Sequence, residues 1–160
     1  MTVEEIYPLA VEFRRHFHQY PEFAMQEVET QRYITGVLDK YKIPYQVVGT
    51  GIIAILGKGQ KCVAIRADMD ALKVKEETGL AYSSCNEGMM HACGHDNHMA
   101  MLLGAAKILT TIRDEIPGTV KLLFQPAEET AQGAKAMIAE GVLKGVDAIY
   151  GAHIWGDFDA

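Results

Sequence analysis

Three short runs of almost continuous apolar residues constrain the fold of this chain most strongly. They are IIAILG (52–57), CVAIRAD (62–68) and TVKLLFQ (119–125), rich in β-branched residues and separated by segments that contain glycine or proline. Runs this short and this apolar are typical of strands buried on both faces, which occur in sheets covered by helices. The chain therefore has to supply helices for both faces of a sheet.

Helical periodicity indicates where those helices lie. The predicted helices, with apolar residues every three or four positions, cover residues 3–18, 26–41, 97–113 and 131–141. Gly141 stands where a glycine commonly ends a helix, and residues 45–49 and 146–154 are predicted as two further strands. Strands and helices alternate in the second half of the chain, which predicts an α/β fold with a mixed, mostly parallel sheet flanked by helices.

Charge and composition exclude several classes of partner. Fifteen Lys and Arg against 21 Asp and Glu give a net charge of -6, with the bases scattered, so nucleic acid is not an expected partner. No apolar run approaches the roughly 20 residues needed to cross a bilayer, and MTVEEIYPLAVEF carries acids where a signal peptide carries bases. Three cysteines without a framework pattern suit a reducing compartment. We predict a cytoplasmic protein with no membrane partner.

Polar residues collect where the predicted strands end. These clusters are Asp68 and Asp70, Glu128 and Glu129, His153, and HACGHD (91–96) at the start of the central helix. The carboxyl ends of parallel strands share one edge of a sheet, where ligands bind in open α/β folds. So many carboxylates at one edge would push one another toward protonation unless cations were present. The sequence therefore predicts bound cations.

Cys93 and His95, two residues apart on a turn at Gly94, can present a thiolate and an imidazole to one point. Cysteine, histidine and carboxylates are the ligands of zinc, and carboxylates extend the range to manganese. The alternative interpretation is a helix-capping loop with Asp96 as the N-cap, which explains the aspartate but not the cysteine and histidine beside it. These residues favour a metal site.

Glu128 and Glu129 follow a buried strand and a proline. Adjacent residues of an extended segment point to opposite sides, so one carboxylate could bind metal while the other faces a substrate. Metal-assisted hydrolysis needs this division of labour, with a general base that takes a proton from activated water. The alternative is a solvated acidic pair at a helix start.

The other histidines carry weaker signals. His153 taken alone is more typical of a hydrogen-bonded histidine near the core, inside the last strand. His16, His18 and His98 are interpreted as structural, with His98 in the first turn of the central helix. No site is assigned to His16, His18 or His98.

Five stretches of the chain resemble the metal-dependent amidohydrolases that remove acyl groups from N-acyl amino acids, relatives of the aminoacylases and carboxypeptidases. They are RRHFHQYPEFAMQEVET (14–30), RADMDAL (66–72), MHACGHDNHMAMLLGAAKIL (90–109), LLFQPAEETAQGAKAMIAEGVL (122–143) and DAIYGAHIW (147–155). The family includes hippurate hydrolases, indole-acetyl-amino-acid hydrolases and N-acetyl-diaminopimelate deacetylases. HACGHD and QPAEE are its most specific motifs in this chain.

The resemblance implies roles for individual residues. It implies two divalent metal ions (Zn, Mn, Co or Ni) with four ligands in this chain, namely Cys93, His95, Glu129 and His153. Glu128 would be the general base and proton shuttle, and Asp70, with Asp68 beside it, would support the site. The implied substrate is a small N-acyl amino acid, hydrolysed to a carboxylate and a free amino acid by metal-activated water. Full-length relatives are expected to form homo-oligomers.

The chain departs from the family pattern in three places. Lys73-Val74 and Asn97 replace an expected Leu-Pro and Gly, which are mild changes outside the ligand set. After Trp155 the sequence reads GDFDA, whereas family members continue with more of the sheet, a lid and dimerisation domain, and a further histidine ligand. We therefore expect residues 1–160 to form the N-terminal portion of a single metallohydrolase catalytic domain, a truncated form with little activity alone.

Three rival functions remain open at this point. The first is a non-catalytic metal-binding fragment, against which the presence of Glu128 argues mildly, because that residue need not bind metal. The second is a cysteine hydrolase that uses Cys93 with His95 or His91, although such nucleophiles usually pair with a histidine distant in sequence. The third is a dipeptidase or carboxypeptidase of the same superfamily.

Overall fold

A computed structural model describes residues 1–155 of the chain. The elements in chain order are α1 (Val3–Gln19), α2 (Val28–Lys40), β1 (Tyr45–Val48), β2 (Gly51–Gly57), β3 (Cys62–Asp68), α3 (His95–Thr111), the short 3₁₀ helix η1 (Arg113–Glu115), β4 (Thr119–Gln125), α4 (Gly133–Ala139) and β5 (Ala148–Gly151). None of the helices in this part of the chain is long and apolar enough to cross a bilayer.

The strands form one mixed sheet in the order β1-β2-β4-β3-β5. β3 pairs in parallel with both β4 and β5, while β2 is antiparallel to both of its neighbours. The reversal of β2 follows from its hairpin with β1, whose two-residue turn places Gly49 at a φ of 59°, a value that glycine tolerates without steric cost. Four of the five strands therefore run in one direction, which confirms the predicted mixed, mostly parallel sheet.

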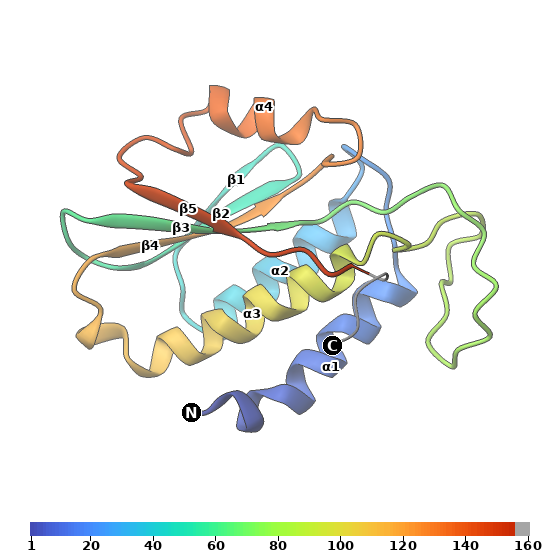
Figure 1. Ribbon diagram of the computed structural model, residues 1–160, viewed down its shortest axis with the longest axis horizontal. Coiled ribbons are helices and arrows are strands. Elements are labelled where there is room, and N and C mark those ends of the chain that lie inside the picture. Colours follow the sequence, from blue (N-terminus) through green and yellow to red (C-terminus); the bar gives the residue numbers. More distant parts are fainter. Residues whose placement is uncertain (156–160) are drawn as a thin grey trace.

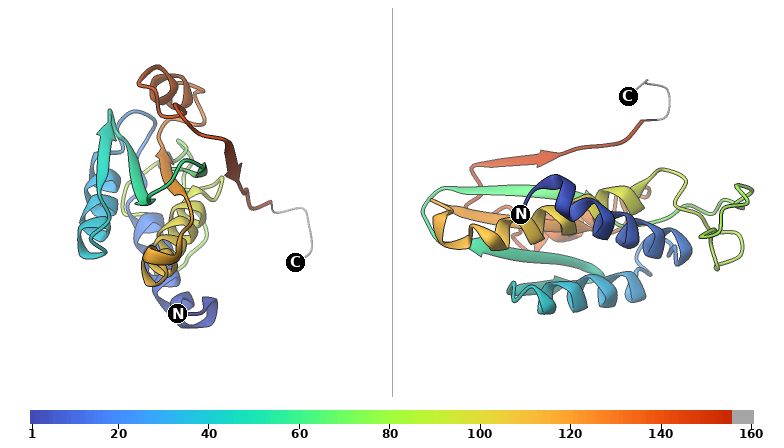
Figure 2. Two further views of the ribbon diagram at one scale, coloured as in Figure 1. Left: turned by 90° about the vertical axis from the view of Figure 1, so that its left-hand side faces the viewer. Right: turned by 90° about the horizontal axis from the view of Figure 1, so that it is seen from below.

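Helices cover both faces of the sheet (Figures 1 and 2). α1, α2 and α3 lie on one side, where the larger core contains residues such as Phe17, Leu38, Leu103 and Phe124, all at most 1% exposed. α4 lies on the opposite face over a smaller cluster that includes Ile53, Leu123 and Met137. Burial from both sides explains why the strand sequences are apolar almost throughout.

Several boundaries differ from the sequence prediction by a few residues, and two of them affect the site. α3 begins at His95, two residues earlier than predicted, so His95 belongs to the first turn of the helix. The prediction that the last strand reaches residue 154 was wrong, because its pairing with β3 ends at the contact of Arg66 with Gly151. His153 therefore lies beyond the sheet, in an extended segment that runs past the start of α3 (Figure 1). The ends of β3, β4 and β5 and the start of α3 come together at this edge.

Candidate metal centre

The turn at Gly94 places Cys93 and His95 together. Gly94 has a φ of 85°, in the left-handed region that favours glycine, and it is the N-cap residue of α3. Cys93, His95 and Glu129 each offer one ligand atom, and these atoms lie within 4.8 Å of one another. The capping alternative was wrong, because Gly94 is the N-cap residue, Asp96 lies inside the helix, and no side chain caps the helix start. The turn presents a thiol and an imidazole to a carboxylate.

His95 is buried with one ring nitrogen unpaired. Its Nδ1 lies 2.9 Å from the carbonyl oxygen of Asp70, whereas the buried Nε2 has no hydrogen-bond partner among the described residues. Three carboxylate oxygens surround that Nε2, at 3.7 Å from Asp68, 3.8 Å from Glu129 and 3.9 Å from Glu128. Burial alone would lower the pKa of His95, but Asp70, Asp68 and Glu129 outweigh it and raise the pKa. These carboxylates therefore stabilise positive charge on the His95 ring.

Asp70 holds the two glutamates in place. Its carboxylate is 1% exposed and accepts the backbone N–H of Glu128 at 2.9 Å and that of Glu129 at 3.0 Å. Burial by itself would raise the pKa of Asp70, yet hydrogen bonds from His95 and from these two amides lower it. Asp70 is therefore an ionised support beneath the glutamates.

The glutamate pair does not adopt the extended conformation that was predicted. The strand β4 ends at Gln125, Ala127 has a φ of 49°, and Glu128 and Glu129 lie in a turn. Because Asp70 accepts both successive amides, the backbone curls around that carboxylate. Both glutamate side chains consequently approach His95 Nε2 instead of pointing to opposite sides.

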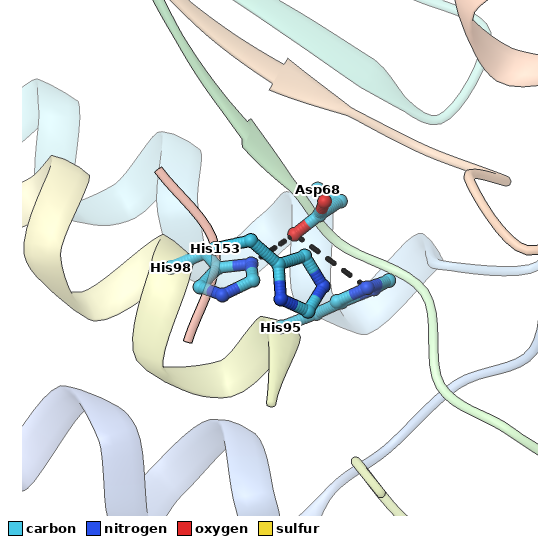
Figure 3. Close-up of side chains that lie close together, drawn as sticks. All are labelled: Asp68, His95, His98 and His153. Carbon is cyan, nitrogen blue, oxygen red and sulfur yellow. Dashed lines mark hydrogen bonds and ion pairs between the residues drawn. The ribbon is translucent and has the colours of Figure 1, made fainter. Parts of the chain in front are cut away.

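His153 reaches the same point from the segment after β5 (Figure 3). Its Nε2 lies 3.5 Å from the sulfur of Cys93, and its ring centroid lies 4.5 Å from that of His98. Ligand atoms of Asp68, His95, His98 and His153 lie within 4.8 Å of one another. The structure thus brings together all four predicted metal ligands, with Glu128 beside them.

His98 and Asp68 are closer to the centre than the sequence indicated. His98 Nδ1 lies 2.5 Å from Asp68 Oδ1, although His98 was interpreted as structural and Asp68 only as a neighbour of Asp70. The spacing of three residues between His95 and His98 is a signal that could have revealed His98, because such residues share one face of a helix.

Cys93 is poorly suited to act as a nucleophile. Burial, the hydrogen bond to Glu129, and the charges of Glu129, Glu128 and Asp68 raise the pKa of its thiol to about 12. A cysteine nucleophile needs a thiolate, which positive neighbours and helix N-termini favour and carboxylates disfavour. A metal ion would reverse this, since a coordinating thiol loses its proton outright. The geometry therefore favours a ligand over a cysteine hydrolase.

A second buried polar cluster anchors the start of α3. Asp96 Oδ2 lies 2.7 Å from His18 Nδ1 and 2.9 Å from Arg14 Nε, and Nε2 of His18 lies 3.1 Å from Glu76. Glu76 also accepts the backbone N–H of Ser84 at 2.6 Å. These contacts join α1 and the 73–90 loop to the helix that carries His95.

The stability of the protein should depend on pH through this cluster. The hydrogen bond with Asp96 raises the pKa of His18 above 6.5 despite burial. The contribution of His18 to the free energy of unfolding is therefore fully present below pH 6.5 and is lost as the pH rises through the pKa of the folded state. Burial would raise the pKa of Glu76, but hydrogen bonds from Ser84, Thr78 and His18 lower it from 4.5 to about 2. The contribution of Glu76 to the free energy of unfolding is therefore lost as pH falls below 4.5.

Urea denaturation should show the largest joint contribution of His18 and Glu76 to the free energy of unfolding near pH 4.5–6.5. The variant His18→Gln should lose less stability than the original chain as the pH rises above this range. Parallel pH profiles for the two proteins would contradict this.

Close packing behind the glutamate turn predicts a destabilised variant. A Cβ added at Gly133 would lie 1.6 Å from the carbonyl oxygen of Pro126, so Gly133→Ala must displace the backbone that leads to Glu128. We expect a loss of about 1–3 kcal/mol in the free energy of unfolding, as for other overpacked sites. Gly36 in α2 is the matched control, because a Cβ there meets nothing within 4 Å. Gly36→Ala should be neutral or raise stability by about 0.5–1 kcal/mol. Thermal or urea unfolding measures both, and equal effects would refute the packing argument.

Residues 64–160 match the family model for peptidase family M20/M25/M40. The chain belongs to this peptidase family. It is 47% identical over 144 residues to N-acetyl-L-cysteine deacetylase of Bacillus subtilis, covering 88% of this chain and 35% of that protein. It is 45% identical over 160 residues to thermostable carboxypeptidase 1 of Saccharolobus solfataricus, covering 95% of this chain and 40% of that protein. The family resemblance carried by HACGHD and QPAEE is thereby confirmed.

A solved structure supports the same assignment. The Bacillus subtilis YXEP protein, described as a dinuclear metal binding peptidase from the M20 family, superposes with a TM-score of 0.92 at 42% identity, covering 96% of this chain and 45% of that one. The chain thus spans about 35–45% of the length of these three proteins. The donor set of this chain fits a divalent metal ion, because a thiol, imidazoles and carboxylates converge on an unpaired imidazole nitrogen.

Proposed function

We propose that this chain forms the N-terminal portion of a metallohydrolase catalytic domain that cleaves the amide bond of N-acyl amino acids. The observation that carries the proposal is the convergence of the Cys93 thiol, the His153 imidazole and three carboxylates (Asp68, Glu128 and Glu129) on His95, whose Nε2 is unpaired among the described residues. Metal-assisted hydrolysis requires a set of metal ligands and, beside it, a carboxylate that can accept and release a proton. A purely structural metal site would have no need of the second glutamate.

In this proposal, Cys93, His95, Glu129 and His153 hold divalent metal, up to two ions of zinc, manganese, cobalt or nickel. Such ions, when bound, lower the pKa of water and polarise an amide carbonyl. His95 contributes Nε2, because its Nδ1 is engaged by the carbonyl oxygen of Asp70. That hydrogen bond also fixes the orientation of the imidazole ring, as is usual for metal-binding histidines.

Glu128 is proposed as the general base. Its side chain is 40% exposed, so it can meet both water and substrate, and one of its oxygens lies 3.9 Å from His95 Nε2. It would take a proton from the attacking water and deliver that proton to the nitrogen of the departing amino acid. Asp70 acts indirectly, since it holds the backbone amides of Glu128 and Glu129.

The substrate class is supported by the similarity to a protein named as an N-acetyl-L-cysteine deacetylase. A carboxypeptidase is the second candidate, supported by the similarity to a thermostable carboxypeptidase. Both would break an amide bond next to an amino acid, so the group on the acyl side distinguishes them. We also propose a reducing compartment such as the cytoplasm, because metal binding by Cys93 requires a free thiol, and Cys62, Cys85 and Cys93 are all free.

Metal analysis combined with a substrate panel tests this proposal. The chain should bind divalent metal and lose it on dialysis against a chelator. Hydrolysis of N-acetyl and N-benzoyl amino acids, measured on this chain and on the complete catalytic domain, should appear only when metal is restored. A preference for dipeptides over N-acyl amino acids would favour the carboxypeptidase. Hydrolysis that survives complete metal removal, or failure of the chain to bind any divalent metal, would contradict the proposed function.

A further inference from the structure

His98 makes hydrogen bonds through both of its ring nitrogens. The backbone N–H of Ile154 donates to Nε2 at 3.1 Å, and Nδ1 lies 2.5 Å from Asp68 Oδ1. A backbone N–H can only donate, so Nε2 must carry a lone pair and the proton must reside on Nδ1, where it is donated to Asp68. Both nitrogens are therefore occupied, which argues against His98 as a metal ligand despite its closeness to the centre.

Asp68 is itself held from the opposite side. Its second oxygen, Oδ2, accepts from Arg66 at 2.7 Å, and the Nε of Arg66 donates to Gln125 at 2.8 Å. Asp68 is 1% exposed, and its pKa is about 2, because His98, His95 and Arg66 together outweigh the effect of burial. A continuous series of hydrogen bonds thus runs from β4 through β3 and α3 to the segment after β5.

That segment has few other attachments among the described residues. Residues 152–155 are exposed and lie beyond the last paired residue of β5, Gly151. Ile154 packs on the glycine turn of the metal centre, since a Cβ on Gly94 would lie 2.3 Å from its Cδ1. The hydrogen bond from Ile154 to His98 fixes the backbone directly after His153.

We propose that His98 is a positioning residue that presents His153 to the metal centre, with its tautomer set by Asp68. The inference rests on the proposed function, because it assumes that His153 binds metal. His98 acts through the backbone of Ile154 rather than through the metal, and the buried Asp68–Arg66–Gln125 series makes its orientation rigid. Outer partners of this kind typically change metal affinity by about 10- to 100-fold when they are removed.

Two substitutions of His98 separate its two hydrogen bonds. Asparagine is short and its amide can replace Nδ1 as the donor to Asp68, but it does not reach Ile154. The longer glutamine can place an oxygen where Nε2 accepts from Ile154. We therefore expect His98→Asn to weaken Co²⁺ binding by about 10- to 100-fold and His98→Gln to weaken it by much less. Isothermal titration of the metal-free chain with Co²⁺ measures both, and circular dichroism checks folding.

The decisive measurement is the coupling to His153. His153→Ala should weaken Co²⁺ binding, and His98→Asn should have almost no further effect in the His153→Ala background. If His98→Asn weakens binding equally in both backgrounds, its role is structural and the inference is overturned. If His153→Ala leaves Co²⁺ affinity unchanged, the ligand set itself fails, which is a different result.

A second measurement needs no substitution. In the ¹⁵N-labelled, metal-free chain, long-range ¹H–¹⁵N correlation spectra distinguish the two tautomers of each neutral histidine. We expect His98 to carry its proton on Nδ1. A proton on Nε2 would leave no acceptor for Ile154 and would overturn the proposal even if every variant failed to fold.

Discussion

Replacing Glu128 with glutamine is expected to reduce kcat for N-acyl amino acid hydrolysis by about 10²- to 10⁴-fold, the usual contribution of a general acid–base group. Glutamine has nearly the same shape but cannot accept and return a proton. Because the Glu128 side chain is 40% exposed, the substitution should cost little folding stability. The measurement is kcat of the complete catalytic domain at saturating metal and substrate, with metal content determined on the same samples.

Glu129→Gln is the matched comparison for this experiment. The two residues are adjacent and lie almost equally far from His95 Nε2, at 3.9 and 3.8 Å, so any general change in charge affects both variants similarly. The Glu129 variant should lose metal affinity, whereas the Glu128 variant should keep metal and lose turnover. If Glu128→Gln turned over at the original rate, or if both variants lost metal equally, the assignment of roles would be wrong.

The sheet was predictable because its signal is local. Strands buried on both faces require apolar side chains at consecutive positions, so β2, β3 and β4 could be located to within a residue from IIAILG, CVAIRAD and TVKLLFQ. The end of β5 was not predictable in this way. Residues 152–154 remain partly apolar, but the backbone N–H of Ile154 donates to His98 rather than to a neighbouring strand, and periodicity carries no information about such a partner.

The candidate site was predictable only in part, because local sequence patterns do not reveal which distant residues contact one another. Cys93, His95 and Glu129 stand in recognisable positions after strands or at a helix start, so edge placement was enough to group them. The partners of Asp96, which are Arg14 and His18, come from α1, and His18 in turn contacts Glu76 of the 73–90 loop. Contacts of this kind depend on how helices pack on the sheet, which no short motif records.

Asp70→Asn is expected to have the largest effect among substitutions that touch neither metal nor substrate directly. Both oxygens of the buried Asp70 carboxylate accept a backbone N–H, from Glu128 and from Glu129. An asparagine must turn its NH₂ group toward one of these donors, so one buried N–H loses its acceptor. We expect a loss of about 1.5–3 kcal/mol in the free energy of unfolding, the range for a hydrogen bond to a charged group.

The same substitution should also lower metal affinity and turnover, because the turn that carries both glutamates is built on this carboxylate. Asp147→Asn is the control, since Asp147 is exposed and its Oδ2 accepts the backbone N–H of Cys62 at 2.8 Å, at the start of β3 rather than at its end. Urea unfolding and Co²⁺ titration of both variants measure the two effects. The control should lose little stability and no metal affinity. If Asp70→Asn lost stability but bound Co²⁺ as tightly as the original chain, Glu129 would not depend on Asp70 for its position, and the link from the buried aspartate to the metal centre would have to be abandoned.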